Sequence, residues 1–403
     1  MRCRVFAVGA LRRAGQDAAG LPAAVSPAQP VGRPAEQPDR FRLRLRGEPH
    51  LGWRLGHAAG SSSLMSNPSQ EYRDHPWMGV FPATLCAFHP DENLDEAGLR
   101  AYFAWLCRVP GLKGLVCNGH TGEIMALDPA ERARVTQILA EEVRKSDRPL
   151  KVISGVAAEG SRVAIQHAKA AKAAAADAIL LMPPHYQLRF GRPSDTAVGF
   201  VADVAEEADI DIVVHQYPSW TKVSYTLAEM LEMVKLPRVV CIKMGTRDMA
   251  RWLYDYEQLK AAAPHVTIIT CYDEYLLPTL LEAGDGALIG FAGFAPELMV
   301  QLVDACVAGD LKAAKAAQRL VAPLARLIYN FGEPGCSAHQ RMKIALWLLG
   351  KISSPVFRRP TRPLAARQIE RIRADLQAIG MEPINGAPAT VREPEAAGLR
   401  VVA

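Results

Sequence analysis

Short apolar runs rich in β-branched residues alternate with helical stretches through most of this 403-residue chain. This alternation is typical of parallel βα units, in which a helix follows each strand and covers the sheet. The runs are GVFPATL at 79–85, GLVCNG at 114–119, KVISGV at 151–156, DAILLM at 177–182, DIVVH at 211–215, VVCIK at 239–243, VTIIT at 266–270 and GALIGF at 286–291. Eight runs at this spacing predict an α/β fold, a (β/α)₈ TIM barrel, over residues 75–309.

Residues 310–381 have a different pattern, because their apolar residues recur at three- and four-residue spacing. This predicts a C-terminal helical extension of three helices. Residues 382–403 contain several Pro and Gly and are expected to form a loose tail. Inside the barrel, Asp128 and Thr226 each precede a glutamate by three residues, which predicts two helix N-termini with capping boxes.

The first 66 residues are rich in Arg, Ala and Pro and show no sustained apolar period. We expect residues 1–66 to be a disordered N-terminal segment. Its Arg-rich, acid-poor start also resembles a transit peptide, but its proline content and missing amphipathic period count against that interpretation. We favour a start assigned too early, with Met65 as the first residue.

The net charge of +5 comes from the N-terminal segment, where ten arginines face four acidic residues. The rest of the chain is nearly neutral, so it has no basic face for DNA or RNA. No run of about 18 apolar residues is present, which argues against a membrane span. The expected partners are therefore small molecules.

The cysteine and glycine patterns exclude several kinds of site. None of the eight cysteines forms a CxxC pair, so we interpret them as reduced thiols of a cytoplasmic protein. No His, Asp or Glu cluster has metal-ligand spacing, so a metal-dependent aldolase is disfavoured. Gly284 and Gly286 lack the rest of a dinucleotide-binding fingerprint. We expect neither a metal nor an organic cofactor.

In a barrel of this type, the reacting groups lie at the C-terminal ends of the strands. The run VVCIK ends in Lys243, so an amine finishes a buried apolar strand. Burial would lower its pKa toward the neutral form that attacks carbonyls. The alternative is a solvated lysine at the barrel rim.

The second run ends in a glycine-flanked loop, Gly119-His120-Thr121-Gly122. Backbone N–H groups and the Thr121 hydroxyl can hold a small anion such as a carboxylate in such a loop. A tight turn is the equally simple alternative. The fourth and fifth runs end near Tyr186 and His215, which can move protons or can be packed rim residues.

These pieces together resemble the dihydrodipicolinate synthase and N-acetylneuraminate lyase family of class I aldolase barrels. The likeness covers roughly residues 78–380. It rests on GLVCNGHTGE followed by LDPAER, on PPHY, on HQYPSW, on VVCIKMGTRD, on GDGALIGFAGFAPELM and on MKIALWLLG. The resemblance implies a Schiff-base lyase that acts on a 2-oxo acid, and a homotetramer or homodimer.

The resemblance also implies roles for single residues. Lys243 matches the lysine that forms the imine, and Thr121 matches a hydroxyl residue that holds the carboxylate. Tyr186 matches a tyrosine of the proton relay. Ile289 matches a residue whose backbone faces the bound pyruvate.

Three positions depart from the family pattern. His120 replaces the first hydroxyl of the loop, His215 replaces a tyrosine, and Trp220 stands where an arginine is common. Imidazoles can move protons near neutral pH, whereas Trp220 removes a carboxylate clamp. We therefore expect an aldolase that joins pyruvate to a neutral or aromatic aldehyde. The alternatives are a sugar-acid dehydratase that keeps the imine, and an inactive ligand-binding barrel.

Overall fold

Eight parallel strands form one sheet in the order β1-β8-β7-β6-β5-β4-β3-β2 in this computed structural model, which describes residues 72–193, 195–329 and 336–384. Parallel bridges join Val80 to Leu112 and Ala83 to Val116, so the two ends of the sheet meet. The strands are β1 Gly79–Pro82, β2 Gly114–Cys117, β3 Lys151–Val156, β4 Ala178–Leu181, β5 Asp211–Gln216, β6 Val239–Met244, β7 Thr267–Thr270 and β8 Gly286–Ile289. The predicted (β/α)₈ barrel is confirmed.

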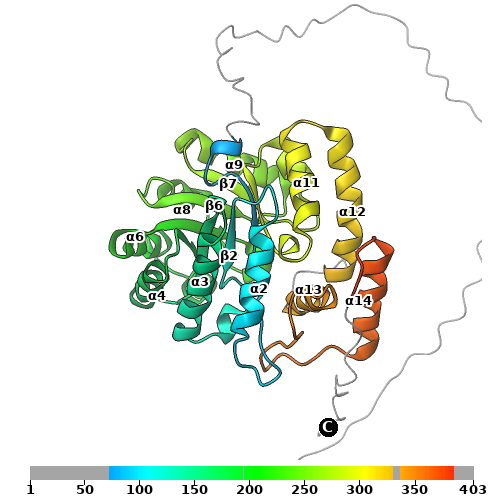
Figure 1. Cartoon of the computed structure of the whole chain (residues 1–403). Coiled ribbons are helices and arrows are strands. Elements are labelled where there is room, and N and C mark those ends of the chain that lie inside the picture. The colour runs from blue at the N-terminus through cyan, green and yellow to red at the C-terminus, as the bar shows by residue number, and fades with distance from the viewer. Residues whose placement is uncertain (1–71, 194, 330–335, 385–403) are drawn as a thin grey trace, which may run out of the picture. The chain divides into compact units, whose positions relative to one another are not determined.

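Helices surround the strands (Figure 1). The barrel helices are α2 Glu96–Cys107, α3 Pro129–Arg144, α4 Ser161–Ala173, α5 His185–Phe190, α6 Thr196–Ala208, α7 Pro218–Thr221, α8 Leu227–Met233, α9 Met249–Ala262, α10 Leu277–Glu282 and α11 Pro296–Val307, with 3₁₀ turns η1 Ile124–Ala126 and η2 Phe291–Gly293. Both predicted capping boxes are confirmed. Asp128 caps α3 with Glu131, and Thr226 caps α8 with Glu229.

The three predicted C-terminal helices are confirmed as α12 Leu311–Tyr329, α13 Cys336–Leu348 and α14 Ala366–Ala378, which lie beside one another in Figure 1. The segment 1–66, expected to be disordered, lies outside the described residues, as does most of the expected tail 382–403. The part of the chain that the structure describes contains no helix long and apolar enough to cross a bilayer.

Each strand sends at least one buried apolar side chain into the middle of the barrel. These side chains pack as one cluster, separate from the larger core between strands and helices. In strand order they are Phe81, Val116, Ile153, Leu180, Val213, Cys241, Ile269 and Leu288. Side chains alternate across a strand, so the second residue after each of these also points inward, one layer nearer the C-terminal mouth. The apolar layer thus forms a floor below the space at the C-terminal ends of the strands.

A buried ion pair attaches the C-terminal extension to this mouth. Lys343 of α13 donates to the carboxylate of Glu123, which directly follows the predicted anion-binding loop. Its ammonium also donates to the carbonyl of Val356 at 2.8 Å and lies 4.5 Å from the ring centroids of Phe88 and Phe357. Burial lowers the pKa of Lys343 and raises that of Glu123, whereas the opposite charge of each partner counteracts both shifts.

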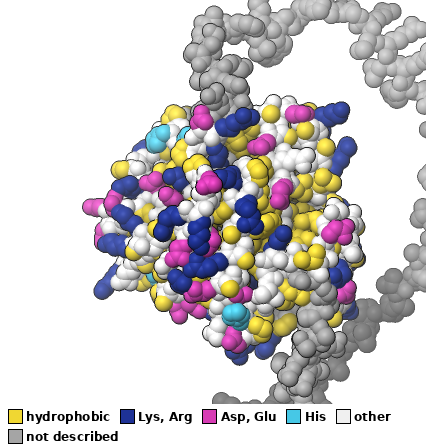
Figure 2. Space-filling view, in the orientation of Figure 1, with side chains coloured by type: hydrophobic (Ala, Val, Ile, Leu, Met, Phe, Trp, Pro, Cys, Tyr) yellow, Lys and Arg dark blue, Asp and Glu magenta, His cyan; other side chains and the backbone are white. Residues whose placement is uncertain are grey.

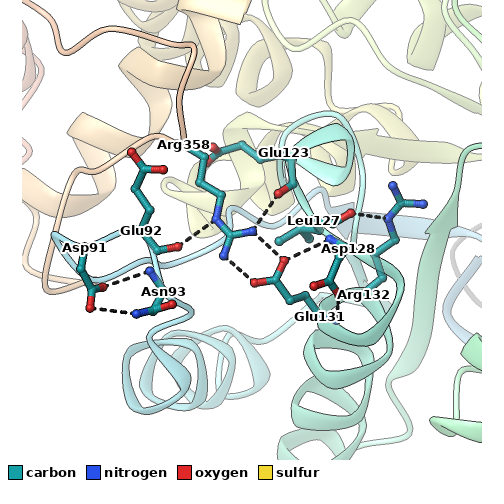
Figure 3. Close-up of polar contacts among 10 residues, drawn as sticks. Asp91, Glu92, Asn93, Glu123, Leu127, Asp128, Glu131, Arg132 and Arg358 are labelled. Carbon is teal, nitrogen blue, oxygen red and sulfur yellow. Dashed lines mark hydrogen bonds and ion pairs between the residues drawn. The ribbon is translucent and has the colours of Figure 1, made fainter.

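Arg358 extends this attachment to helix α3 (Figure 3). Its guanidinium forms a two-pronged contact with Glu131, at 2.6 and 2.5 Å, and donates to the carbonyl of Ala126 at 2.7 Å. Its backbone N–H donates to Glu123 at 3.1 Å. Glu131 also completes the capping box of α3, so one carboxylate serves both the helix start and the extension.

Ion pairs on the surface contribute less to stability than these buried contacts. On the face seen in Figure 2, basic and acidic side chains are interspersed rather than gathered by sign. Arg134 of α3 and Glu96 of α2 form one such pair at 2.5 Å, with side-chain exposures of 34% and 45%. Exposed pairs of this kind typically stabilise a protein by less than ~1 kcal/mol.

We predict that Lys343→Met lowers the free energy of unfolding by about 3–5 kcal/mol, because it leaves the Glu123 carboxylate buried without its cation. The matched surface variant Glu96→Gln should lower it by less than ~1 kcal/mol. Urea unfolding followed by circular dichroism measures both. Equal effects of the two variants would show that the buried pair does not hold the extension in place.

Candidate active site

A small cavity lies directly above the apolar floor, at the C-terminal ends of the strands. It measures about 30 Å³, which suits a few atoms of a ligand or one or two waters. Ala83, His215, Lys243, Cys271 and Gly290 line it, and each follows a floor residue by two positions. Strand alternation alone therefore places these five residues around one space.

Lys243 is the amine of this cavity. It is 9% exposed, pairs in register with His215 of β5 and Ile269 of β7, and its Nζ lies 5.9 Å from the centroid of the Tyr217 ring. Burial lowers the pKa of Lys243, although the charges of Cys271 and Asp273 oppose the shift. A larger fraction of the side chain is therefore the neutral amine that can attack a carbonyl.

The glycine-flanked loop after β2 contributes Gly119, His120 and Thr121 to the cavity wall. Gly122 does not line the cavity. A Cβ there would meet the carbonyl oxygen of Thr84 at 3.1 Å, and the Gly122 N–H donates to the Gly119 carbonyl at 3.1 Å. The structure thus explains Gly122 by close packing of the turn, and places the other three residues beside Lys243.

Two of the residues that depart from the family pattern face each other. The ring centroids of His120 and His215 are 5.5 Å apart. Burial, followed by the charge of Lys243, lowers the pKa of His120 to about 4 and that of His215 well below its usual value. His215 is 1% exposed, and neither of its ring nitrogens has a hydrogen-bond partner among the described residues. A buried imidazole whose nitrogens lack hydrogen-bond partners lowers the stability of the fold, unless a bound ligand supplies those partners.

Sequence reasoning missed several residues of the cavity. The further lining residues are Leu180, Tyr217, Asp273, Leu288, Tyr329, His339 and Met342, together with Ala83, Cys271 and Gly290. Asp273 follows β7 by three residues, so the rule of strand ends would have found it. Tyr329, His339 and Met342 belong to the C-terminal helices, and no local pattern indicates that they reach the barrel mouth.

Asp273 is a buried carboxyl held by two donors. It accepts from the Phe291 N–H at 2.6 Å and from the Tyr329 hydroxyl at 2.9 Å. Burial raises its pKa to about 6 despite these hydrogen bonds. Asp273 therefore exchanges a proton near neutral pH within the same cavity as Lys243.

Two further predicted site residues, Tyr186 and Ile289, do not line this cavity. Tyr186 lies on α5 and is 61% exposed, with its ring against Phe190. Ile289 points away from the barrel interior, and its carbonyl accepts from the Ala83 N–H at 2.9 Å. Trp220 belongs to α7, and its side chain lies outside the described residues. Within this chain, Lys243, His215, His120, Thr121 and Gly119 are the predicted residues that meet.

Fold and site together define a (β/α)₈ barrel with a buried amine in its C-terminal mouth. The model of the Dihydrodipicolinate synthetase family matches residues 76–379, and the chain belongs to that family. It is accordingly a carbon–carbon lyase of this type, as the sequence motifs predict.

Curated relatives and solved structures agree with this assignment. A 4-hydroxy-tetrahydrodipicolinate synthase from Acidiphilium cryptum is 29% identical over 75% of this chain and 98% of its own length. An uncharacterized DapA-like lyase from Halobacterium salinarum is 31% identical over 75% of this chain and 94% of its own. The dihydrodipicolinate synthase from Acinetobacter baumannii, solved with pyruvate, is 25% identical with a TM-score of 0.68 over 75% of this chain and 99% of that one.

We predict that His215→Leu keeps or raises the free energy of unfolding, by up to ~1–3 kcal/mol, because it removes a buried imidazole whose nitrogens lack partners. Its neighbour Gln216 is the matched control. The Gln216 side chain donates to the Tyr225 carbonyl at 2.9 Å and accepts from the Tyr225 N–H at 3.0 Å, so Gln216→Leu should destabilise the protein. Urea unfolding measures the free energy of unfolding of both variants. If His215→Leu destabilises as much as Gln216→Leu, His215 serves packing rather than a ligand.

Proposed function

We propose that this protein is an aldolase in which Lys243 forms a Schiff base with pyruvate or a related 2-oxo acid. The observation that carries the proposal is the position of Lys243: it is buried near the end of β6, with a lowered pKa, in a cavity that three imidazoles also line. The Acinetobacter baumannii relative was solved with pyruvate, which supports the same class of substrate here.

The reaction follows from this arrangement. The neutral amine of Lys243 attacks the ketone carbon, and the resulting carbinolamine takes up a proton and loses water to give a cationic imine. Loss of a proton from the methyl carbon then gives an enamine, which attacks the aldehyde carbon. Protonation of the aldehyde oxygen and hydrolysis of the imine release a 4-hydroxy-2-oxo acid and restore Lys243.

The neighbouring residues have complementary roles in this proposal. Gly119 and Thr121 hold the carboxylate through a backbone N–H and a hydroxyl. His215 and His120 move the protons, because neutral imidazoles carry both a donor and an acceptor. Since Tyr186 is exposed on α5, we assign it no proton transfer within the same chain.

We further propose a cytoplasmic protein that works as a homotetramer or homodimer. Six cysteines, Cys86, Cys107, Cys117, Cys241, Cys271 and Cys306, are free and buried, which supports a reducing compartment. Two exposed aromatic rings, Tyr186 and Phe190, lie on α5 with their centroids 5.2 Å apart, and they support an interface with a second copy.

We predict that hydride reduction in the presence of pyruvate adds one adduct to the protein, at Lys243. Lys243→Ala should abolish it. Lys343 serves as an internal control, because it is also buried but is paired with Glu123, and it should stay unmodified. Intact-mass analysis counts the adducts, and peptide mapping identifies the lysine that carries each one. Reduction at another lysine, or no adduct with any 2-oxo acid, contradicts the proposal.

We infer the acceptor from the sequence at Trp220, because the family resemblance predicts an arginine at this position. We predict that the natural protein prefers benzaldehyde to aspartate semialdehyde as the acceptor for pyruvate. Trp220→Arg should shift the ratio of kcat/KM values toward the acidic aldehyde by roughly 10- to 150-fold, since a charged hydrogen bond is regained. A natural protein that uses aspartate semialdehyde as well as any neutral aldehyde would show that another cation serves the acceptor.

A further inference from the structure

The C-terminal extension places a third imidazole on the cavity wall. His339 lies in the first turn of α13, is 8% exposed and lines the same space as Lys243 and Thr121. The helix that carries it is fixed to the mouth by Lys343, four residues farther along, through the pair with Glu123. His339 is therefore held beside the site by an attachment that does not involve the barrel strands.

His339 lies near the loop that we propose holds the carboxylate. The charges acting on it come from His120, in that loop, and from Lys243. The loop after β2 and helix α13 thus meet at one cavity. A carboxylate held by Gly119 and Thr121 in a space of about 30 Å³ lies next to His339 as well.

The cavity contains few groups that can balance an entering negative charge. No arginine is among its lining residues in the described part of the chain. Lys243 must be neutral to attack, so it offers no charge until the imine has formed. A carboxylate that enters a dry space without a cation pays a large desolvation penalty. The charge must therefore come from an imidazole that gains a proton.

Several other titratable groups line the same cavity as His339 and compete with it for a proton. They belong to the loop after β2, to strands β5 and β6, to the residues that follow β5 and β7, and to α12. In chain order they are His120, His215, Tyr217, Lys243, Cys271, Asp273 and Tyr329. Asp273 already accepts hydrogen bonds from the Phe291 N–H and the Tyr329 hydroxyl. Lys343 of the same helix is paired with Glu123.

We propose that His339 is a substrate-binding residue that takes a proton from solvent as the carboxylate of a 2-oxo acid enters the cavity, and then pairs with that carboxylate. The inference rests on the proposed Schiff-base function, and it concerns affinity rather than the covalent step. It makes the C-terminal extension part of the recognition of anionic donors.

The sign of the pH dependence follows from linkage. Burial keeps the pKa of His339 well below its usual value in the free protein, and an adjacent carboxylate raises it in the complex. Binding therefore takes up a proton, so the contribution of His339 is fully present below its pKa in the free protein. It is lost as the pH rises through its pKa in the complex.

The test measures the pyruvate concentration that gives half-maximal trapping by cyanoborohydride at Lys243, between about pH 6 and pH 8.5, the range in which an imidazole exchanges its proton. For His339→Gln we expect this concentration to rise about tenfold or more at the acidic end, since a charge-assisted contact is lost. The difference from the natural protein should shrink toward the alkaline end, and trapping at saturating pyruvate should persist. His265→Gln, exposed in the loop before β7, is the matched control and should change nothing.

Methyl pyruvate provides a second measurement that needs no variant. It keeps the ketone but carries no charge, so its half-maximal concentration should not respond to His339 or show the same rise with pH. Equal half-maximal concentrations of pyruvate in the natural protein and His339→Gln, or the same pH dependence for both ligands, would overturn the inference and leave Lys243 as the nucleophile. Absence of trapping in the natural protein would instead contradict the proposed function.

Discussion

Side-chain alternation along eight parallel strands is the constraint on which both the core and the site depend. Residues such as Val213 and Cys241 close the barrel with an apolar floor, and two positions later His215 and Lys243 enter the cavity above it. The floor excludes water from below. The same packing that stabilises the barrel therefore provides the low dielectric that lowers the pKa of the amine.

The C-terminal extension supplies part of the cavity wall that the strands do not form. Lys343 and Arg358 attach it to Glu123 and Glu131, and the helices then supply Tyr329 and His339 to the cavity wall. Hydroxyl groups typical of the family are replaced here by imidazoles at 120 and 215. A site with three imidazoles on its wall exchanges protons differently from a site built on phenols, because burial lowers the pKa of an imidazole and raises that of a phenol such as Tyr217.

The barrel, its capping boxes and the central lysine were predictable because each depends on local pattern. Strand period and strand ends place Lys243, His215 and Thr121 without knowledge of the fold's details. Tyr329 and His339 were not predictable, since a helix after the barrel can pack in several ways and only tertiary contacts decide which face meets the mouth. Gly122 shows that one pattern can have two physical causes: the sequence predicts an anion-binding glycine, and the structure adds close packing against the carbonyl of Thr84.

The central claim is that Lys243 forms a covalent imine with a 2-oxo acid in this cavity. A crystal structure of the protein soaked with pyruvate tests it directly. We expect continuous electron density from the Nζ of Lys243 to C2 of the ligand, with the carboxylate beside Thr121 and His339. Pyruvate bound as a free ketone away from Lys243, or attached to a different lysine, would contradict it.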